Sequence, residues 1–118
     1  MLLEDPIASS IETRDGVAVL AVRGEIDVAS APAFKSAIAE ALEGNPEGLV
    51  LNLLDVEFLG SVGVRVLLEA QGKIGDDGRF AVVARSPAAG RILQLLSLDE
   101  VLSVHSTVDE ALSWMAAA

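Results

Sequence analysis

Residues 48–68 read GLVLNLLDVEFLGSVGVRVLL, and the spacing of their apolar residues changes halfway along. Gly48 to Leu53 is an almost continuous apolar run, which is typical of a strand covered on both faces. From about Ser61 onward the apolar residues follow helical spacing, with Val64 and Leu67 on one face. A buried strand that leads through a glycine-flanked turn into an amphipathic helix indicates an α/β fold.

The same alternation of strand and helix patterns extends over the rest of the chain. The predicted elements are strands at 7–13 and 17–22 joined by an Asp-Gly hairpin, a loop at 24–28, a helix at 30–42, the strand at 48–53, a helix at 61–74, a strand at 80–84, a short helix opened by Ser86-Pro87, a strand at 101–105 and a last helix opened by Ser106 or Thr107. This order predicts one domain with a mostly parallel or mixed central sheet of about five strands and about four helices. We expect the domain to span residues 8–116, after an N-terminal extension of residues 1–7.

The composition is that of a globular protein and excludes several function classes. The chain has 118 residues, of which 52% are hydrophobic and 22% charged. It has no cysteine and a single histidine, which argues against disulfide scaffolds, thiol nucleophiles, Cys- or His-rich metal sites and His-containing triads. The formal net charge of −10 argues against nucleic acid as a partner, because phosphate binding needs clustered Lys and Arg.

Membrane and export signals are also missing from the sequence. No stretch reaches the ~18–20 uncharged apolar residues of a membrane span. The segment from Met1 to Pro6 is acidic and lacks the basic start and apolar run of a signal peptide. We therefore expect a cytoplasmic protein that does not insert into membranes.

Catalytic motifs are similarly scarce. Dinucleotide-binding and P-loop glycine patterns do not occur, and Gly60-Ser61-Val62-Gly63 is one residue too short for a nucleophile elbow. Asp76-Asp77 is predicted to be a solvated turn rather than a metal pair, and His105 a surface residue at a strand end. We expect no catalytic residue, no cofactor and no metal site.

Ser61 is the remaining candidate functional residue. It is predicted at or beside a helix N-terminus, where unpaired N–H groups and a partial charge of about +0.5 favour an anion. The alternative is that Ser61 is only an N-cap between two glycines that permit a tight turn. Local physics by itself favours this second interpretation.

The segment from Val56 to Leu68 resembles the signature of the STAS domain (sulfate transporter and anti-sigma factor antagonist). In small bacterial anti-sigma factor antagonists this signature reads approximately Phe-[Leu/Met/Ile]-Asp-Ser-[Ser/Thr]-Gly-Leu-x-x-Leu. Four further segments resemble the family in the same order, and the resemblance covers about residues 8–116: Val22–Asp27, Leu49–Leu53, Phe80–Pro87 with Arg91–Leu93, and Thr107–Leu112.

The resemblance implies a regulatory role for Ser61. In these antagonists an anti-sigma factor, which is also an ATP-dependent serine kinase, binds the unmodified protein and releases its sigma factor. The kinase then inactivates the antagonist by phosphorylating the first serine after the motif's Asp, and we expect a phosphatase to reverse this. Ser61 matches that serine, but Gly60 replaces the motif's Asp and Val62 its second hydroxyl residue. Ser61 is therefore the only acceptor in the turn.

The resemblance also implies a partner surface around Ser61. The expected contact residues are Glu25, Asp27, Gly60, Ser61, Val62, Gly63, Arg65, Val66 and Glu69. A phosphate should block this surface by its bulk and by repulsion from partner carboxylates, because a helix N-terminus tolerates an anion without unfolding. We expect a monomer when the protein is free. The alternative is a constitutive STAS subunit of a larger complex, such as an ATP-driven lipid transporter, in which Ser61 is a simple cap.

Overall fold

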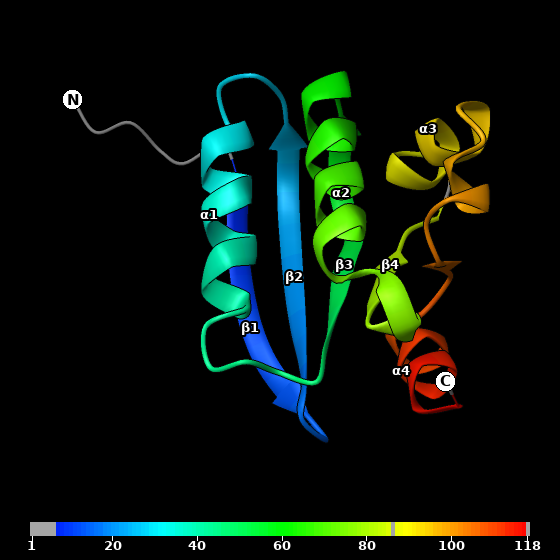
Figure 1. Cartoon of the computed structure of the whole chain (residues 1–118). Helices are drawn as coiled ribbons and strands as arrows, with labels where there is room; N and C mark the ends of the chain where they lie inside the picture. Colours follow the sequence, from blue (N-terminus) through cyan, green and yellow to red (C-terminus); the bar gives the residue numbers. More distant parts are fainter. Residues whose placement is uncertain (1–6, 86, 118) are drawn as a thin grey trace.

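The centre of the molecule is a mixed sheet, seen in a computed structural model that describes residues 7–85 and 87–117. Its five strands lie in the order β1-β2-β3-β4-β5 (Figure 1). The outer strand β1 is antiparallel to β2, and the remaining neighbours are parallel. The strands are β1 (Ile7–Arg14), β2 (Val17–Ile26), β3 (Gly48–Leu59), β4 (Phe80–Val83) and β5 (Val104–His105).

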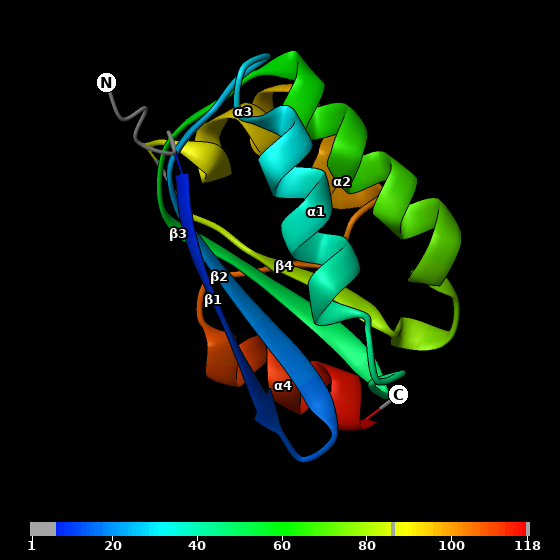
Figure 2. The same ribbon diagram turned by 90° about the vertical axis from the view of Figure 1, so that its left-hand side faces the viewer.

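Helices cover both faces of this sheet, as Figure 2 shows. One face carries α1 (Ala31–Ala41), α2 (Ser61–Ile74) and α3 (Ala89–Leu95), and the other carries α4 (Val108–Ala117). Short 3₁₀ turns, η1 (Asp76–Gly78) and η2 (Leu98–Glu100), follow α2 and α3. The predicted α/β class, with a mixed sheet and helices packed on it, is confirmed.

The continuous apolar runs of the central strands have a direct structural cause. Alternate residues of a strand point to opposite faces of the sheet. Leu51 packs into the core cluster with Phe34 and Leu67 under α1 and α2. Its neighbour Val50 belongs to a second cluster with Ala111 of α4. Because both faces are covered, both sets of side chains must be apolar.

The β1–β2 connection is the predicted two-residue hairpin. Arg14 pairs with Val17, and the intervening Asp15 and Gly16 have φ of 51° and 85°. Two consecutive residues with positive φ match the twist of the flanking strands, and Asp-Gly is a favoured sequence for that turn.

Two strands extend further than predicted. Glu25 and Ile26, which we expected in a loop, belong to β2, and β3 runs to Leu59 rather than ending at Leu53. The register between these strands shifts at Ala21/Arg23 and at Gly24/Glu25. The prediction relied on continuous apolar runs, and these stop at the exposed residues Arg23 and Asp55 although the strands continue.

The C-terminal third also differs from the prediction in detail. The short helix α3 begins at Ala89, while Pro87 lies in the preceding turn and Ser86 lies outside the described residues. The last strand is only Val104–His105. Of the two predicted openings of the last helix, Ser106 and Thr107, it is Thr107 that caps α4, since its Oγ1 accepts the Glu110 N–H at 3.0 Å.

Candidate functional site

Ser61 is the exposed first residue of α2, and it is not the helix cap. Gly60 occupies the N-cap position, with φ −82° and ψ 174°, and its carbonyl accepts the first helical N–H, from Val64, at 3.1 Å. The interpretation of Ser61 as an N-cap is therefore wrong. Its hydroxyl has no capping role in the fold and faces solvent at the positive end of the helix dipole.

The end of β2 lies directly beside this turn. Ile26 pairs with Leu59, and the Ile26 carbonyl accepts the Gly60 N–H at 2.9 Å. Glu25 is exposed and pairs with Phe58, and Asp27 follows Ile26 at the end of the strand. The structure thus brings Glu25 and Asp27 to the edge of the sheet at which α2 begins.

Ser30 holds the connection between β2 and α1 in place. Its Oγ donates to the Glu25 carbonyl at 2.7 Å and accepts the Asp27 N–H at 2.9 Å. In return, Asp27 Oδ1 accepts the Ser30 N–H at 3.0 Å. Ser30 occupies the N-cap position of α1, but its side chain makes no cap bond there. The three-residue spacing of Asp27 and Ser30, which suits reciprocal side chain–backbone bonds, was the missed signal.

The predicted contact residues of α2 divide into exposed and buried positions. Ser61, Arg65 and Glu69 are exposed, and Val62 is half-buried. Glu69 Oε1 lies 3.8 Å from Lys35 Nζ of α1, so this part of the surface includes an ion pair between the two helices.

Two of the expected contact residues are buried instead. Val66 is 6% exposed and belongs to the core, and a Cβ on Gly63 would lie 2.6 Å from Leu59 Cδ1. The Val66 side chain and a Cβ at Gly63 both point beneath the helix, toward α1 and the strand ends. Conversely Leu68 is exposed, although it follows the buried Leu67 in the apolar sequence of this helix. The buried arc of α2 is rotated relative to the predicted one because this helix packs on the sheet and on α1 together.

The same edge carries exposed apolar side chains that sequence reasoning did not single out. Val28 is 77% and Phe58 51% exposed, and they flank the acidic residues at the end of β2. Phe58 lies at the second register shift between β2 and β3, where strand alternation does not predict which side chains are exposed. The surface beside Ser61 is thus partly apolar.

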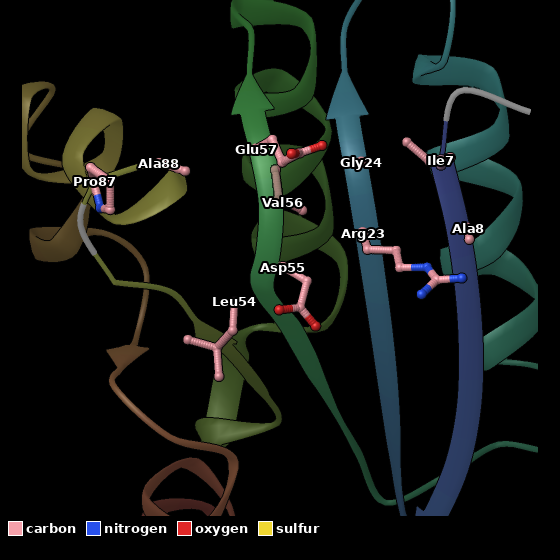
Figure 3. Close-up of a pocket in the computed structure, with 10 residues that line it drawn as sticks. All are labelled: Ile7, Ala8, Arg23, Gly24, Leu54, Asp55, Val56, Glu57, Pro87 and Ala88. Carbon is pink, nitrogen blue, oxygen red and sulfur yellow. The ribbon is translucent and has the colours of Figure 1, made fainter.

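A groove of about 770 Å³ opens near the ends of β2 and β3, on the face of the sheet opposite α1 and α2. Helix α4 covers another part of the same face (Figure 2). Figure 3 shows Arg23 of β2 and Asp55 and Glu57 of β3 in this groove, with Pro87 and Ala88 at its far rim. Arg23 and Asp55 are register partners. The groove is shallow and combines charges of both signs.

Other chemistry is not visible in the described part of the chain. Within it, no cluster of three or more His, Asp or Glu side chains could hold a metal ion. No helix there has the length and apolarity needed to cross a bilayer. His105 is half-buried rather than a surface residue, because its ring packs 5.3 Å from that of Trp114.

Comparison with known proteins gives consistent matches over nearly the whole chain. The family model of the STAS domain matches residues 8–111. The anti-sigma-F factor antagonist RsfB of Mycobacterium tuberculosis is 42% identical over 113 residues, covering 96% of this chain and 93% of the relative. RsfA of the same organism, also named an anti-sigma-F factor antagonist, is 32% identical over 94% of this chain and 89% of its own length. The crystal structure of an anti-sigma factor antagonist from Mycobacterium paratuberculosis superimposes with a TM-score of 0.88, at 40% identity, over 98% of this chain and 99% of that one.

Proposed function

This chain belongs to the STAS-domain family, and from that premise we propose that it is an anti-sigma factor antagonist. It binds an anti-sigma factor in the cytoplasm and so releases a sigma factor for transcription. It acts by binding and not by catalysis, and it is a monomer when free. The observation that carries the proposal is Ser61, an exposed hydroxyl at the start of α2 that the fold does not use as a cap.

The switch is phosphorylation of Ser61 by the anti-sigma factor, which acts as an ATP-dependent serine kinase, with a phosphatase restoring the active form. A phosphate adds about −1.5 to −2 charges and three acceptor oxygens. The N-terminus of α2 can accommodate that anion, because its free N–H groups and its dipole both favour negative charge. The domain therefore stays folded, and the phosphate acts at the interface.

The partner surface consists of the exposed and half-buried residues around that serine. They are Glu25, Asp27, Gly60, Ser61, Val62, Arg65 and Glu69. Gly63 and Val66 support this surface from beneath the helix and do not contact the partner. The kinase recognises a turn without the motif's Asp, since Gly60 stands in its place.

Charge substitution at Ser61 tests the proposal. We expect Ser61→Asp to bind the host's anti-sigma factor at least about tenfold more weakly than wild type, because a carboxylate without a partner must lose its water at the interface. Ser61→Ala should bind like wild type and resist phosphorylation. Isothermal titration calorimetry gives the dissociation constants, and intact mass after incubation with ATP gives the modification.

Ser113→Asp is the matched control, because Ser113 is exposed on α4, at the opposite face of the sheet. It adds the same charge and should leave binding unchanged. If Ser61→Asp bound as tightly as wild type, a block by charge at this position would be refuted.

The replacement of the motif's Asp by Gly60 also favours a second candidate function. In that case the chain is a constitutive STAS subunit of a larger assembly, such as a lipid transporter driven by ATP. Affinity purification from the native host distinguishes the two, because the first predicts a soluble kinase as the partner and the second the ATPase of a membrane transporter.

A further inference from the structure

We propose that Phe58 is the apolar anchor of the partner interface and that its ring enters an apolar pocket of the anti-sigma factor. This inference rests on the proposed function and adds the contact that gives it affinity and specificity. Aromatic side chains supply much of the binding energy at many interfaces, because they bury a large apolar area with little loss of conformational freedom.

Phe58 is the one exposed residue among the three phenylalanines of this chain. The other phenylalanines, Phe34 and Phe80, are 0% and 1% exposed, whereas Phe58 leaves 51% of its surface in contact with water. Leaving an aromatic ring half in water forgoes the free energy of burying it. A partner that covers the ring recovers that free energy.

The ring lies against the turn that carries Ser61. A Cβ added to Gly60 would lie 3.2 Å from Phe58 Cε2 and 3.4 Å from the Ile26 carbonyl oxygen. The edge of the ring therefore packs beside the Gly60 backbone, immediately before the hydroxyl. A partner that contacts Ser61 must also meet Phe58, which makes the anti-sigma factor the occupant of this surface.

The absence of a side chain at Gly60 determines what the partner must provide. Where the family pattern has a carboxylate, this chain presents the hydrocarbon edge of Phe58. Burying a carboxylate against an apolar surface is costly without a hydrogen-bond partner. An anti-sigma factor with an apolar pocket at this point accepts this chain and discriminates against antagonists that carry the Asp.

The same arrangement explains how a phosphate on Ser61 opposes binding. Closure of an apolar pocket over Phe58 brings the partner next to the phosphate and strips its water. The penalty falls on the complex and not on the free domain. The anchor and the switch thus act through one surface.

Truncation of the ring tests the proposal. The probe is the anti-sigma factor of the host that binds wild-type protein, measured by titration calorimetry. We expect Phe58→Ala to weaken binding by about 10–30-fold. Phe58→Leu, which keeps an apolar side chain, should stay within about threefold of wild type. Leu95→Ala is the matched control, because Leu95 is 66% exposed on α3, outside the proposed surface.

Substitutions at Gly60 test the specificity argument. Gly60→Ala adds only the Cβ, which the ring accommodates by a small shift, and it should cost less than about threefold in affinity. Gly60→Asp restores the family pattern and should weaken binding by at least about tenfold. Thermal unfolding of each variant establishes that the domain is folded at the temperature of the titration.

The outcomes separate this inference from the proposed function. If wild type binds an anti-sigma factor and Phe58→Ala binds it equally well, the anchor is refuted and the proposed function stands. A Gly60→Asp variant that binds more tightly than wild type would likewise overturn the apolar pocket. If wild type binds none of the host's anti-sigma factors, the proposed function fails, and the anchor fails with it.

Discussion

Ser30 shows how a single buried hydroxyl positions an exposed surface. Its side chain is 0% exposed and links the backbone of Glu25 to that of Asp27. These two residues are the acidic part of the surface beside Ser61. A buried residue thus fixes two residues of the proposed partner surface.

Removal of this hydroxyl should loosen the connection. Ser30→Ala leaves the Asp27 N–H and the Glu25 carbonyl without their partner, which should lower the free energy of unfolding by about 1–3 kcal/mol. Urea denaturation measures the loss, and hydrogen exchange should show faster exchange at the Asp27 amide. Ser36→Ala, at an exposed position of α1, should change stability by less than about 0.5 kcal/mol. Equal stability of both variants would refute the role assigned to Ser30.

At the scale of the element, α2 is placed by a close approach at Gly63. A Cβ there would lie 2.6 Å from Leu59 Cδ1 and 2.7 Å from Ile26 Cγ2, both of which belong to the core. The first turn of the helix can therefore rest on the ends of β2 and β3. This contact places Ser61 at the sheet edge, beside Glu25.

A pair of glycine substitutions in α2 tests this packing. Gly63→Ala should destabilise the domain by about 1–3 kcal/mol, because the methyl group must displace core side chains. Gly72→Ala should stabilise it by about 0.5–1 kcal/mol, because a Cβ there meets no atom within 4 Å and alanine favours the helix. Urea denaturation compares the two. A Gly63→Ala variant as stable as wild type would contradict the close approach.

The sequence predicted the element order well and the ends of the elements poorly, for a physical reason. Runs such as Val17–Val22 are apolar because both faces of the sheet are covered, and that signal survives in a single sequence. The continuation of β2 to Ile26 was missed because the apolar run on which the prediction relied stops at the exposed Arg23. The burial of Val66 depends on how α2 packs on α1, which helical spacing alone does not determine.

On the scale of the whole molecule, the fold gathers its functional candidates at one edge. The ends of β2 and β3 and the start of α2 meet there. Helix α4 packs on the face of the sheet opposite α1 and α2 (Figure 2). The position of Ser61 in that edge was predictable from the motif. That Gly60 and not Ser61 caps α2, and that Phe58 is exposed, could be seen only in the three-dimensional structure.

The central claim is that Ser61 is a reversible phosphorylation switch, and one measurement tests it most directly. The protein is purified from its native host in growing and in stressed cells, and its intact mass is determined with and without phosphatase, followed by mapping of the modified residue. The account predicts a single phosphoryl group that phosphatase removes and that maps to Ser61. Absence of phosphate under both conditions, or its location on another residue, would contradict the account and favour a constitutive STAS subunit.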